Sequence, residues 1–338
     1  MSSSNSLDQP RSPVTAPRRL LRWLGWAALA YLVGLTVYLI LYFTIGENFV
    51  VVAFFNHALM WLLMAALPAT VVCLLVFRRR GLLTVLPAIV FIGWYAPQFA
   101  PKPQVEEGLR VATYNVTGYL EPADKIDVIR NLNVDILGIQ ESAAPDTLLA
   151  ELLTIFPYGF VQDDPPDVYE HFGLFSVYPI ETDTVEYLDR STEAMRPVAM
   201  RLTVDVEGQP VSVYVMHAVR PNLPIFSVEL RHFGVLAMLD ALRADPNPAI
   251  VLCDCNMTEW TEDYRLMSSV VMDAWREKGV GLGLTVPATQ IRAPFPLFRG
   301  DYIWHSSEFT TQSIQIVPDS GESEHFPLRA YLTLNSSR

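Results

Sequence analysis

The stretch Val251-Leu252-Cys253-Asp254-Cys255-Asn256 decides the fold of this chain, because an apolar run that begins at Ala249 ends there in an acid and an amide. A strand presents residues i and i+2 on the same face. If the strand runs to its end, Asp254 and Asn256 point the same way at the rim of a sheet, where a phosphate, a metal ion or a water could bind. Taken alone, the stretch is more typical of a strand followed by an Asx turn.

The chain consists of two chemically different parts. Of its 338 residues, 51% are hydrophobic and only 18% are charged. Residues 1–103 contain two acids and eight Lys or Arg, whereas residues 104–338 contain 34 acids and 16 bases, a net charge of about −18. A part this acidic is an unfavourable non-specific binder of polyanions, because such binding relies on clusters of Lys and Arg.

Three charge-free runs follow an N-terminal tail, residues 1–17, that is rich in Ser, Pro and Asn and predicted to be disordered. Each run is long enough to cross a bilayer, which needs about 20 residues. Within residues 18–100 the runs predict three transmembrane helices, at about 22–46, 49–77 and 81–98. Asn56 and His57 lie in the second run, where they could mark a functional site or a helix–helix hydrogen bond.

Basic clusters predict the orientation of these spans. Arg18, Arg19 and Arg22 precede the first run, and residues 78–80, all arginine, separate the second from the third. The positive-inside rule places both clusters in the cytoplasm. Three spans then put everything after Pro101 on the extracytoplasmic side of a multi-pass membrane protein whose partner is the lipid bilayer.

The exported part begins with a linker at 101–108, and a single domain is predicted over 109–338. Alternating or apolar β-rich runs predict strands, and apolar residues at helical spacing predict helices at about 122–132, 146–155, 226–244 and 261–268. Roughly 235 residues suit one α/β (α+β) domain of two packed sheets with helices outside. Cys253 and Cys255 are expected to be too constrained to bridge easily, and to serve as small buried hydrophobic residues.

Polar residues stand at the ends of five apolar strands, and a histidine precedes a sixth. These residues are Asn115, Glu141, His217, Asp254 with Asn256, Asp301 and His325. Each one alone has an ordinary explanation as a turn former, a helix cap or a satisfied core residue. Together, at strand ends in one domain, they predict an active site.

The chemistry of these residues suits hydrolysis of a phosphoester. Glu141 and Asn115 offer hard oxygen ligands, which suit Mg²⁺ or Mn²⁺ rather than zinc. Asp301 beside His325 would fix the imidazole tautomer and raise its basicity, so that His325 can deprotonate water.

Three further residues would complete that chemistry. Asp254 and Asn256 would orient the water and hold the phosphate. His217 could donate a hydrogen bond to a phosphate oxygen or protonate the leaving group.

The same stretches resemble, in order, the motifs of the endonuclease/exonuclease/phosphatase superfamily, which has the DNase I-like fold. The resemblance covers residues 105–335 and rests on residues 109–116, 135–141, 173–180, His217, 253–256, 301–303 and 323–325. It implies a four-layer αββα sandwich of two packed mixed sheets and divalent-metal hydrolysis of phosphoesters. It also adds Glu324 to the metal candidates, because an aspartate that can approach the metal stands at that position in the family.

Three functions remain open at this level. The first is a membrane-anchored, Mg²⁺- or Mn²⁺-dependent phosphoesterase that faces outward and acts on a lipid headgroup or a small phosphoester. The second is an extracytoplasmic nuclease acting on DNA or RNA, and the third is a membrane-bound binding protein with an inactive site. Arg196, Arg220 and Arg299 are the predicted substrate contacts. The apolar loop of Phe295, Leu297 and Phe298 could contact lipid or belong to the core.

Overall fold

The computed structural model describes residues 16–117, 122–142, 150–162, 171–188, 197–220, 226–288 and 293–335. The chain divides into two compact units, one made of Met1–Gly46 and Ala58–Trp94 and the other of Glu47–His57 and Tyr95–Arg338. The short segment Glu47–His57, which lies in sequence between two apolar helices, therefore belongs to the same unit as the C-terminal domain.

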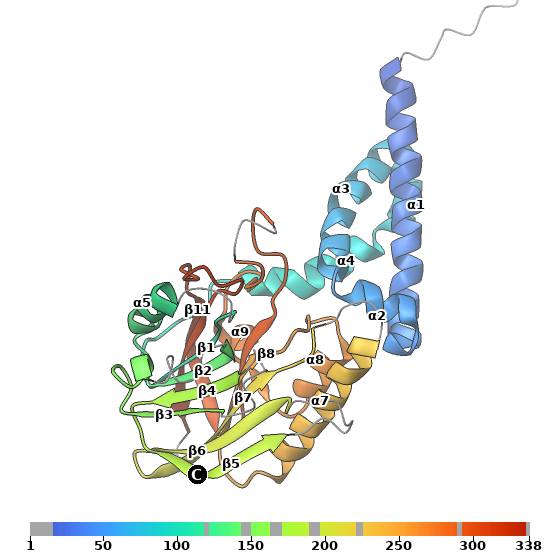
Figure 1. Cartoon of the computed structure of the whole chain (residues 1–338). Coiled ribbons are helices and arrows are strands. Elements are labelled where there is room, and N and C mark those ends of the chain that lie inside the picture. The colour runs from blue at the N-terminus through green and yellow to red at the C-terminus, as the bar shows by residue number, and fades with distance from the viewer. Residues whose placement is uncertain are drawn as a thin grey trace, which may run out of the picture. The chain divides into compact units, whose positions relative to one another are not determined.

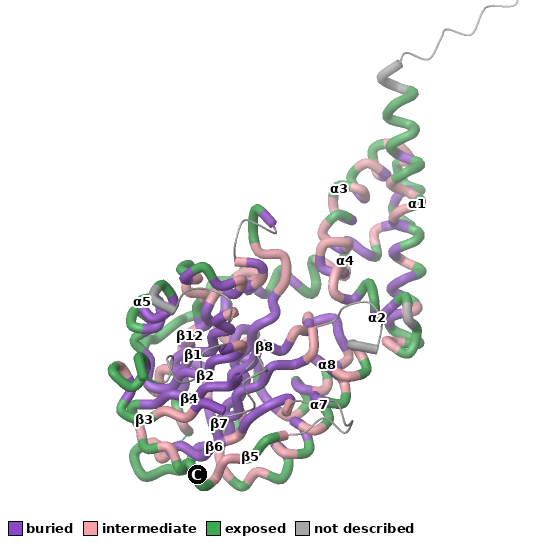
Figure 2. The backbone as a smooth tube through the Cα atoms, viewed as in Figure 1, coloured by how far each residue is buried: buried purple, intermediate pink, exposed green. Residues whose placement is uncertain are grey.

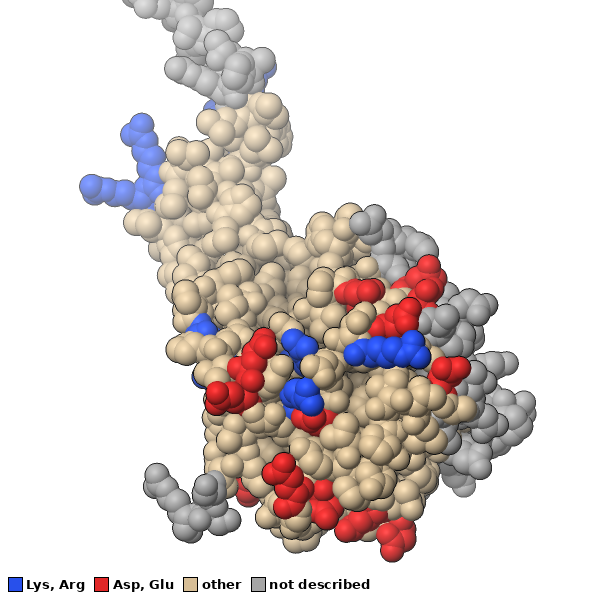
Figure 3. Space-filling view, turned by 90° about the vertical axis from the view of Figure 1, so that its left-hand side faces the viewer, with Lys and Arg blue, Asp and Glu red and all other residues tan. Residues whose placement is uncertain are grey.

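The first unit is helical. It contains α1 (Ala16–Thr44), α3 (Leu59–Phe77), the 3-10 helix η2 (Arg78–Thr84) and most of α4 (Leu86–Tyr95). Helix α1 approaches α3 closely at Gly25, where a Cβ would lie 2.7 Å from a methyl group of Val76. In the space-filling view this unit shows an almost uncharged surface from which a few basic side chains project, all of them arginines because the unit contains no lysine (Figure 3).

Two helical stretches, Arg19–Thr44 and Leu59–Thr84, are long and apolar enough to cross a membrane, by length and composition. Core helices and signal sequences meet the same criteria, so this is weak evidence for a membrane protein. The third predicted span coincides with the shorter apolar stretch Leu86–Phe99. The three predicted spans therefore correspond to two long helices and one shorter helical stretch. A run without charged residues shows that a segment is apolar, but it does not show that the segment forms one continuous helix.

The domain contains two six-stranded sheets with the strand orders β11-β12-β1-β2-β4-β3 and β5-β6-β7-β8-β10-β9. The first sheet is built from β1 (Leu109–Asn115), β2 (Ile136–Ser142), β3 (Tyr158–Val161), β4 (His171–Ser176), β11 (Phe309–Ile316) and β12 (Leu328–Leu334). The second is built from β5 (Ile180–Leu188), β6 (Ala199–Val206), β7 (Gln209–His217), β8 (Ala249–Asp254), β9 (Met272–Asp273) and β10 (Asp301–His305). Both sheets are mixed, since β1 is parallel to β2 and β7 is parallel to β8 while their other pairs are antiparallel.

The two sheets pack face to face around an apolar core, and helices cover their outer faces (Figures 1 and 2). Helix α5 (Pro122–Leu132) packs on the first sheet and α7 (Phe226–Ala244) on the second. Gly138 on β2 lets the sheets approach, because a Cβ there would lie 2.8 Å from Leu252 of β8. The predicted arrangement of two packed mixed sheets with flanking helices is confirmed.

The remaining elements are short. They are η1 (Gly46–Asn48), α2 (Val50–Asn56), η3 (Ala96–Phe99), α8 (Glu262–Met267) and α9 (Ala274–Lys278). One of them, α9, contributes Ala274 and Trp275 to the core. Helices α5 and α7 coincide with the predicted ranges, and α8 with the predicted helix near 261–268. Of the helix predicted at 146–155, residues 146–149 lie outside the described residues, 150–152 are helical and 153–155 form a turn.

Candidate active site

Strand register brings the polar strand ends together. In the second sheet, Asp254 is the direct partner of His217 on parallel β7 and of Asp301 on antiparallel β10. Partners across a sheet point to the same face, and here that face is the one that packs on the first sheet. Asn115 ends β1 in the facing sheet, and its Nδ2 donates a hydrogen bond of 2.8 Å to Asp254 Oδ2. One cluster therefore joins the ends of both sheets.

Glu141 reaches this cluster through an irregularity in β2. The pairing of β2 with β4 shifts register between Ile139 and Ser142, and Glu141 has a φ of 56°. In a regular strand Glu141 would share the outer face with Ile139, and the bulge turns its side chain toward the site. Asn115 Nδ2 also donates to Glu141 Oε1 at 3.0 Å. Non-glycine residues in the left-handed region cost free energy and gather at functional sites.

Asn115 is itself held by the chain that follows. Its side-chain oxygen accepts from the N–H of Thr117 at 2.9 Å, and its backbone carbonyl accepts from Ser323 Oγ at 2.6 Å. Asn115 therefore presents its amide nitrogen, and not its oxygen, to the carboxylates of Glu141 and Asp254. A metal ion could use Asn115 as a ligand only after the amide turns over.

His325 and Asp301 form the predicted acid–histidine pair. His325 Nδ1 lies 3.0 Å from Asp301 Oδ2, and both side chains are almost fully buried. Its Nε2 lies 3.8 Å from Asp254 Oδ2 and has no hydrogen-bond partner within the described residues. Burial by itself lowers the pKa of His325, but the carboxylates of Asp301 and Asp254 outweigh burial and raise it to about 9.

His217 and Arg220 face the cluster from the end of β7. His217 Nε2 lies 3.3 Å from Glu141 Oε1 and 3.5 Å from Asp254 Oδ2. Arg220 Nη2 lies 3.9 Å from Glu141 Oε1, with 40% of its side chain exposed. The side chains of His217 and Arg220 therefore lie where they could contact a phosphate group bound next to these carboxylates.

Asn256 is fixed at the turn that follows β8. Its N–H donates to Asp254 Oδ1 at 3.2 Å, and its Nδ2 donates to the carbonyl of Ala218 at 3.0 Å. Its φ of 45° again places a non-glycine residue in the left-handed region. The hydrogen bond from the N–H of Asn256 to the side chain of Asp254 closes an Asx turn, as the sequence of this stretch indicated. The same turn places Asp254 in the cluster.

Cys253 and Cys255 form a disulfide with Cα atoms 5.1 Å apart, so the prediction that they are unbridged was wrong. Residues i and i+2 of an extended strand lie about 6.6 Å apart. The strand ends at Asp254, and the bend there brings the two Cα atoms within the range of a disulfide. The bridge lies on the outer face of the sheet under α7, away from the Asp254 side chain.

The charges of the cluster suit a cation. Two overlapping groups of side chains have ligand atoms within 4.8 Å of one another, Glu141 with His217 and Asp254, and Asp254 with Asp301 and His325. Among the described residues, three carboxylates thus face two imidazoles and the half-exposed Arg220. Buried carboxylates need compensating charge, and hard oxygen donors of this kind suit Mg²⁺ or Mn²⁺. The residues present therefore fit a divalent ion, whose identity stays open.

The remaining predicted residues are placed differently. Glu324 lies at the rim, where its N–H donates to Thr117 Oγ1 at 3.3 Å. Arg196 lies outside the described residues. Arg299 is buried away from the cluster, where it pairs with Asp273 and lies 3.3 Å from Glu259. Arg299 is therefore left out of the substrate contacts proposed below.

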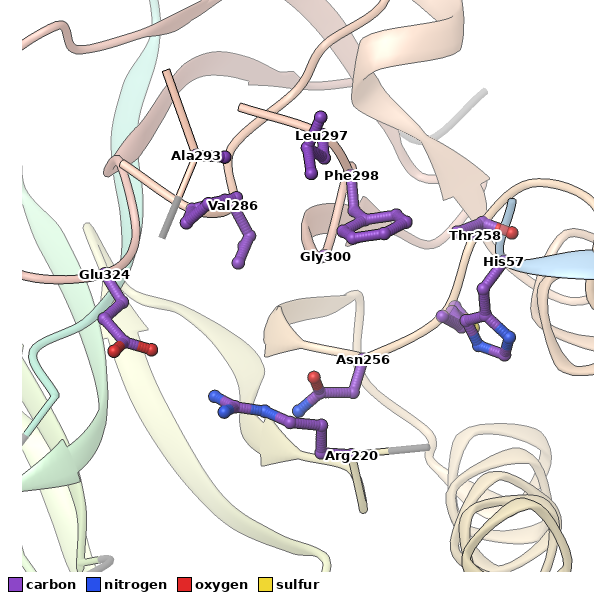
Figure 4. Close-up of a pocket in the computed structure, with 12 residues that line it drawn as sticks. His57, Arg220, Asn256, Thr258, Val286, Ala293, Leu297, Phe298, Gly300 and Glu324 are labelled. Carbon is purple, nitrogen blue, oxygen red and sulfur yellow. The ribbon is translucent and has the colours of Figure 1, made fainter. Parts of the chain in front are cut away.

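A pocket of about 340 Å³ adjoins the carboxylates. Arg220, Asn256 and Glu324 stand on one side of it, and Val286, Leu297 and Phe298 on the other (Figure 4). Gly300 connects the pocket to the cluster, since a Cβ there would lie 3.7 Å from Asp254 Oδ1. Leu297 and Phe298 thus line a cavity beside the site, while Phe295 is half exposed.

The chain belongs to the Endonuclease/Exonuclease/phosphatase family, whose model matches residues 112–325. Membership makes the protein a hydrolase of phosphoester bonds by class, as predicted. No curated protein matches the chain.

Solved structures are similar in fold at low sequence identity. The catalytic domain of human Nocturnin, with bound sulfate, is 17% identical over 71% of this chain and 99% of that one, with a TM-score of 0.56. A mannosyl-6-phosphatase from Bacteroides thetaiotaomicron is 18% identical over 67% of this chain and 100% of that one, with a TM-score of 0.52. The 3′ phosphatase NExo from Neisseria, bound to a product DNA hairpin, is 16% identical over 66% and 98%, with a TM-score of 0.55.

Proposed function

We propose that the protein is a membrane-anchored, divalent-metal-dependent phosphoesterase that hydrolyses a phosphodiester or phosphomonoester with a water activated by Asp301 and His325. The observation that carries the proposal is the buried Nε2 of His325. It lies 3.8 Å from Asp254 Oδ2, has no hydrogen-bond partner among the described residues, and faces the carboxylates. A buried polar atom without a partner costs free energy unless a ligand or water satisfies it.

Each residue has a separate role. Asp301 accepts a hydrogen bond from the Nδ1–H of His325. A cation bound among the carboxylates would offset the negative charge that raises the pKa of His325, so that its Nε2 can take a proton from the attacking water. Arg220 and Asn256 hold the phosphate beside Asp254. His217 donates a hydrogen bond to a phosphate oxygen or protonates the leaving group. The bound water and phosphate are thereby held in place for an in-line displacement.

Glu141 and Asp254 would hold the metal ion, with Asn115 and Glu324 beside them. When bound, Mg²⁺ or Mn²⁺ would neutralise these carboxylates and polarise a phosphoryl oxygen.

Membrane topology is supported by chain connectivity. The carbonyl of Asn56 accepts from Thr258 Oγ1 at 3.3 Å, so Glu47–His57 and the domain must lie on one side of any membrane. If α1 and α3 both cross, the chain has to return after Arg80. Residues 81–99 are helical except at Val85. At α and 3-10 rises the summed length of their helical pieces is about 30 Å, which would match the thickness of the hydrocarbon core if the pieces were aligned.

An extracytoplasmic domain is also supported by the Cys253–Cys255 disulfide, since disulfides persist in oxidising compartments. Fusion of alkaline phosphatase to the C-terminus should give an active reporter in bacteria, because that enzyme needs an oxidising compartment. An inactive C-terminal fusion that becomes active when moved to the N-terminus would contradict this orientation.

Nucleic acid is the competing substrate. A 3′ phosphatase bound to DNA and a sugar phosphatase are both similar to this chain in fold. The charge of about −18 on residues 104–338 disfavours a polyanion and favours a small phosphoester or a lipid headgroup.

The test uses the full chain in lipid nanodiscs with Mg²⁺, assayed on bis(4-nitrophenyl) phosphate, 4-nitrophenyl phosphate and supercoiled plasmid. Wild type should release 4-nitrophenolate, EDTA should stop the release, and Asp254→Ala should slow it by about 10²–10⁴-fold. Asp240→Ala is the matched control, because that carboxylate on α7 is 82% exposed. Nicking of plasmid by wild type but not by Asp254→Ala would establish the nuclease. Failure of the folded chain on all three substrates would favour a binding protein with an inactive site.

A further inference from the structure

The wall of the pocket includes a residue from far outside the matched family region. His57, at the end of the segment Glu47–His57, lines the pocket together with Met257, Thr258 and Phe298 (Figure 4). The family model begins only at residue 112. A residue that precedes the whole domain in sequence therefore contributes to the cavity beside the catalytic cluster.

His57 is held in place by a buried arginine. Its Nε2 lies 3.0 Å from Nη1 of Arg231, a residue of α7 that is fully buried. A guanidinium can only donate, so Nε2 of His57 accepts and the imidazole is neutral. A neutral imidazole can present its ring carbon atoms to the pocket as apolar surface.

The same arginine holds the turn that carries Asn256. Arg231 Nη1 also donates to the backbone carbonyl of Asn256 at 3.2 Å, and Arg231 Nε donates to Asp263 Oδ2 at 2.6 Å. Glu47 lies at 4.0 Å from Arg231 Nη2. The guanidinium therefore links the segment Glu47–His57 at one side to a predicted phosphate contact at the other.

The pocket has two chemically different ends. Arg220 and Asn256 offer donors beside the carboxylate cluster, whereas Val286, Pro287, Leu297 and Phe298 offer apolar surface. A ligand that matches both ends carries a phosphate at the first and an alkyl group at the second. Burial of apolar surface would then add to the affinity of the phosphate.

We infer that the segment Glu47–His57 completes the substrate pocket: His57 forms part of the wall of a subsite for an apolar group esterified to the phosphate, and it acts through Arg231 as a positioning residue for Asn256. The inference rests on the proposed function for the identity of the polar end. It assigns specificity to the segment Glu47–His57, which lies between two apolar helices, so substrate choice depends on a part of the chain that precedes the matched family region.

The two roles of His57 can be separated by binding, without turnover. The probes are methylphosphonate and hexylphosphonate, measured by calorimetry on the full chain in nanodiscs with Mg²⁺, after subtraction of empty nanodiscs. Methylphosphonate reports the polar end, and the ratio of the two dissociation constants reports the apolar subsite. Wild type should bind hexylphosphonate about tenfold more tightly or better.

Three variants give the comparison. His57→Ala should weaken methylphosphonate and reduce the preference for hexyl by about threefold or more. His57→Gln, which keeps an acceptor for Arg231, should restore the affinity for methylphosphonate. His232→Ala is the matched control, because His232 Nδ1 lies 2.8 Å from Asp263 Oδ1 in the same ion-pair network and does not line the pocket. It should leave both values unchanged.

Two results would overturn the inference. One is equal binding of both phosphonates, or of neither, by wild type. The other is an equal change in His57→Ala and His232→Ala, which would reduce His57 to a structural partner of the ion pair. Hydrolysis of bis(4-nitrophenyl) phosphate is assayed on the same samples, so loss of the subsite and loss of the proposed enzymatic activity are distinguished.

Discussion

Two buried charged clusters of the C-terminal domain differ in charge balance. The Arg299 cluster consists of Arg299, Arg276, Glu259 and Asp273, in which two guanidinium groups pair with two carboxylates. The catalytic cluster gathers Glu141, Asp254 and Asp301 around two histidines, with Arg220 at its edge. With the function proposed above, the comparison teaches that charge balance separates a cluster that stabilises the fold from one that would receive a cation and a substrate.

The largest expected effect is on activity. Replacement of Asp301 by Asn leaves His325 without its carboxylate partner, so turnover should fall by about 10²–10⁴-fold. In EDTA the midpoint of thermal unfolding should also fall, because the buried His325 loses the carboxylate that raises its pKa. Unchanged turnover in the folded variant would contradict a role of Asp301 in the reaction.

The Arg299 cluster should lose stability and keep activity. Arg299→Met removes the guanidinium that pairs with buried Asp273 and lies 3.3 Å from Glu259, and should lower the free energy of unfolding by about 3–5 kcal/mol. Activity per folded molecule should change little. Arg243→Met is the control, since that side chain is 55% exposed. Chemical denaturation measures the difference, and a selective loss of turnover without destabilisation would return Arg299 to the active site.

Added Mg²⁺ should stabilise the folded protein through the catalytic cluster. At free Mg²⁺ of 100 times the dissociation constant, the expected gain is about 2.7 kcal/mol. Wild type should show this gain in thermal unfolding, and Glu141→Gln should show less. An equal gain in both proteins would place the ion elsewhere.

The smallest effect is expected for the disulfide. It closes a very short loop, so Cys253→Ala with Cys255→Ala should cost about 1–2 kcal/mol of stability. Activity should remain, because the bridge lies on the face of the sheet opposite to Asp254. Reaction of the denatured, unreduced wild type with two equivalents of iodoacetamide at these cysteines would show that the bridge is absent.

Sequence reasoning predicted the parts of the site that strand ends determine. Asp254, His217 and Asp301 meet because neighbouring strands share register, and register follows from the apolar alternation of β7, β8 and β10. The order of the sequence motifs along the chain also predicted that His325 and Asn115 belong to the same site. The fold of two packed sheets was predictable on the same grounds.

Other features depend on three-dimensional packing, which the alternation of apolar and polar residues along the strands does not predict. Glu141 enters the site through a bulge with positive φ, and the bend after Asp254 allows the disulfide. Arg299 was predicted to contact the substrate as one of the few bases near the predicted site, but its side chain pairs with Asp273 and lies over the ring of Tyr302, on the other face of the sheet.

His57 and Arg231 were missed as contributors to the pocket, although signals were present. His57 follows Asn56 and Glu47 in an otherwise apolar stretch, and Arg231 lies within a predicted amphipathic helix and turns out fully buried. Polar residues in such places need partners, but the sequence does not say which ones.

Metal binding tests the central claim most directly. The full chain in nanodiscs of uncharged lipid is titrated with Mn²⁺, and the free ion is followed by electron paramagnetic resonance. Wild type should bind Mn²⁺, and Asp254→Asn should bind it about 10–100-fold more weakly. The control is Glu259→Gln in the Arg299 cluster, measured below the unfolding temperature of that variant, and it should bind Mn²⁺ as wild type does. Equal binding by wild type and Asp254→Asn would contradict the assignment of the unbalanced cluster as the metal-dependent active site.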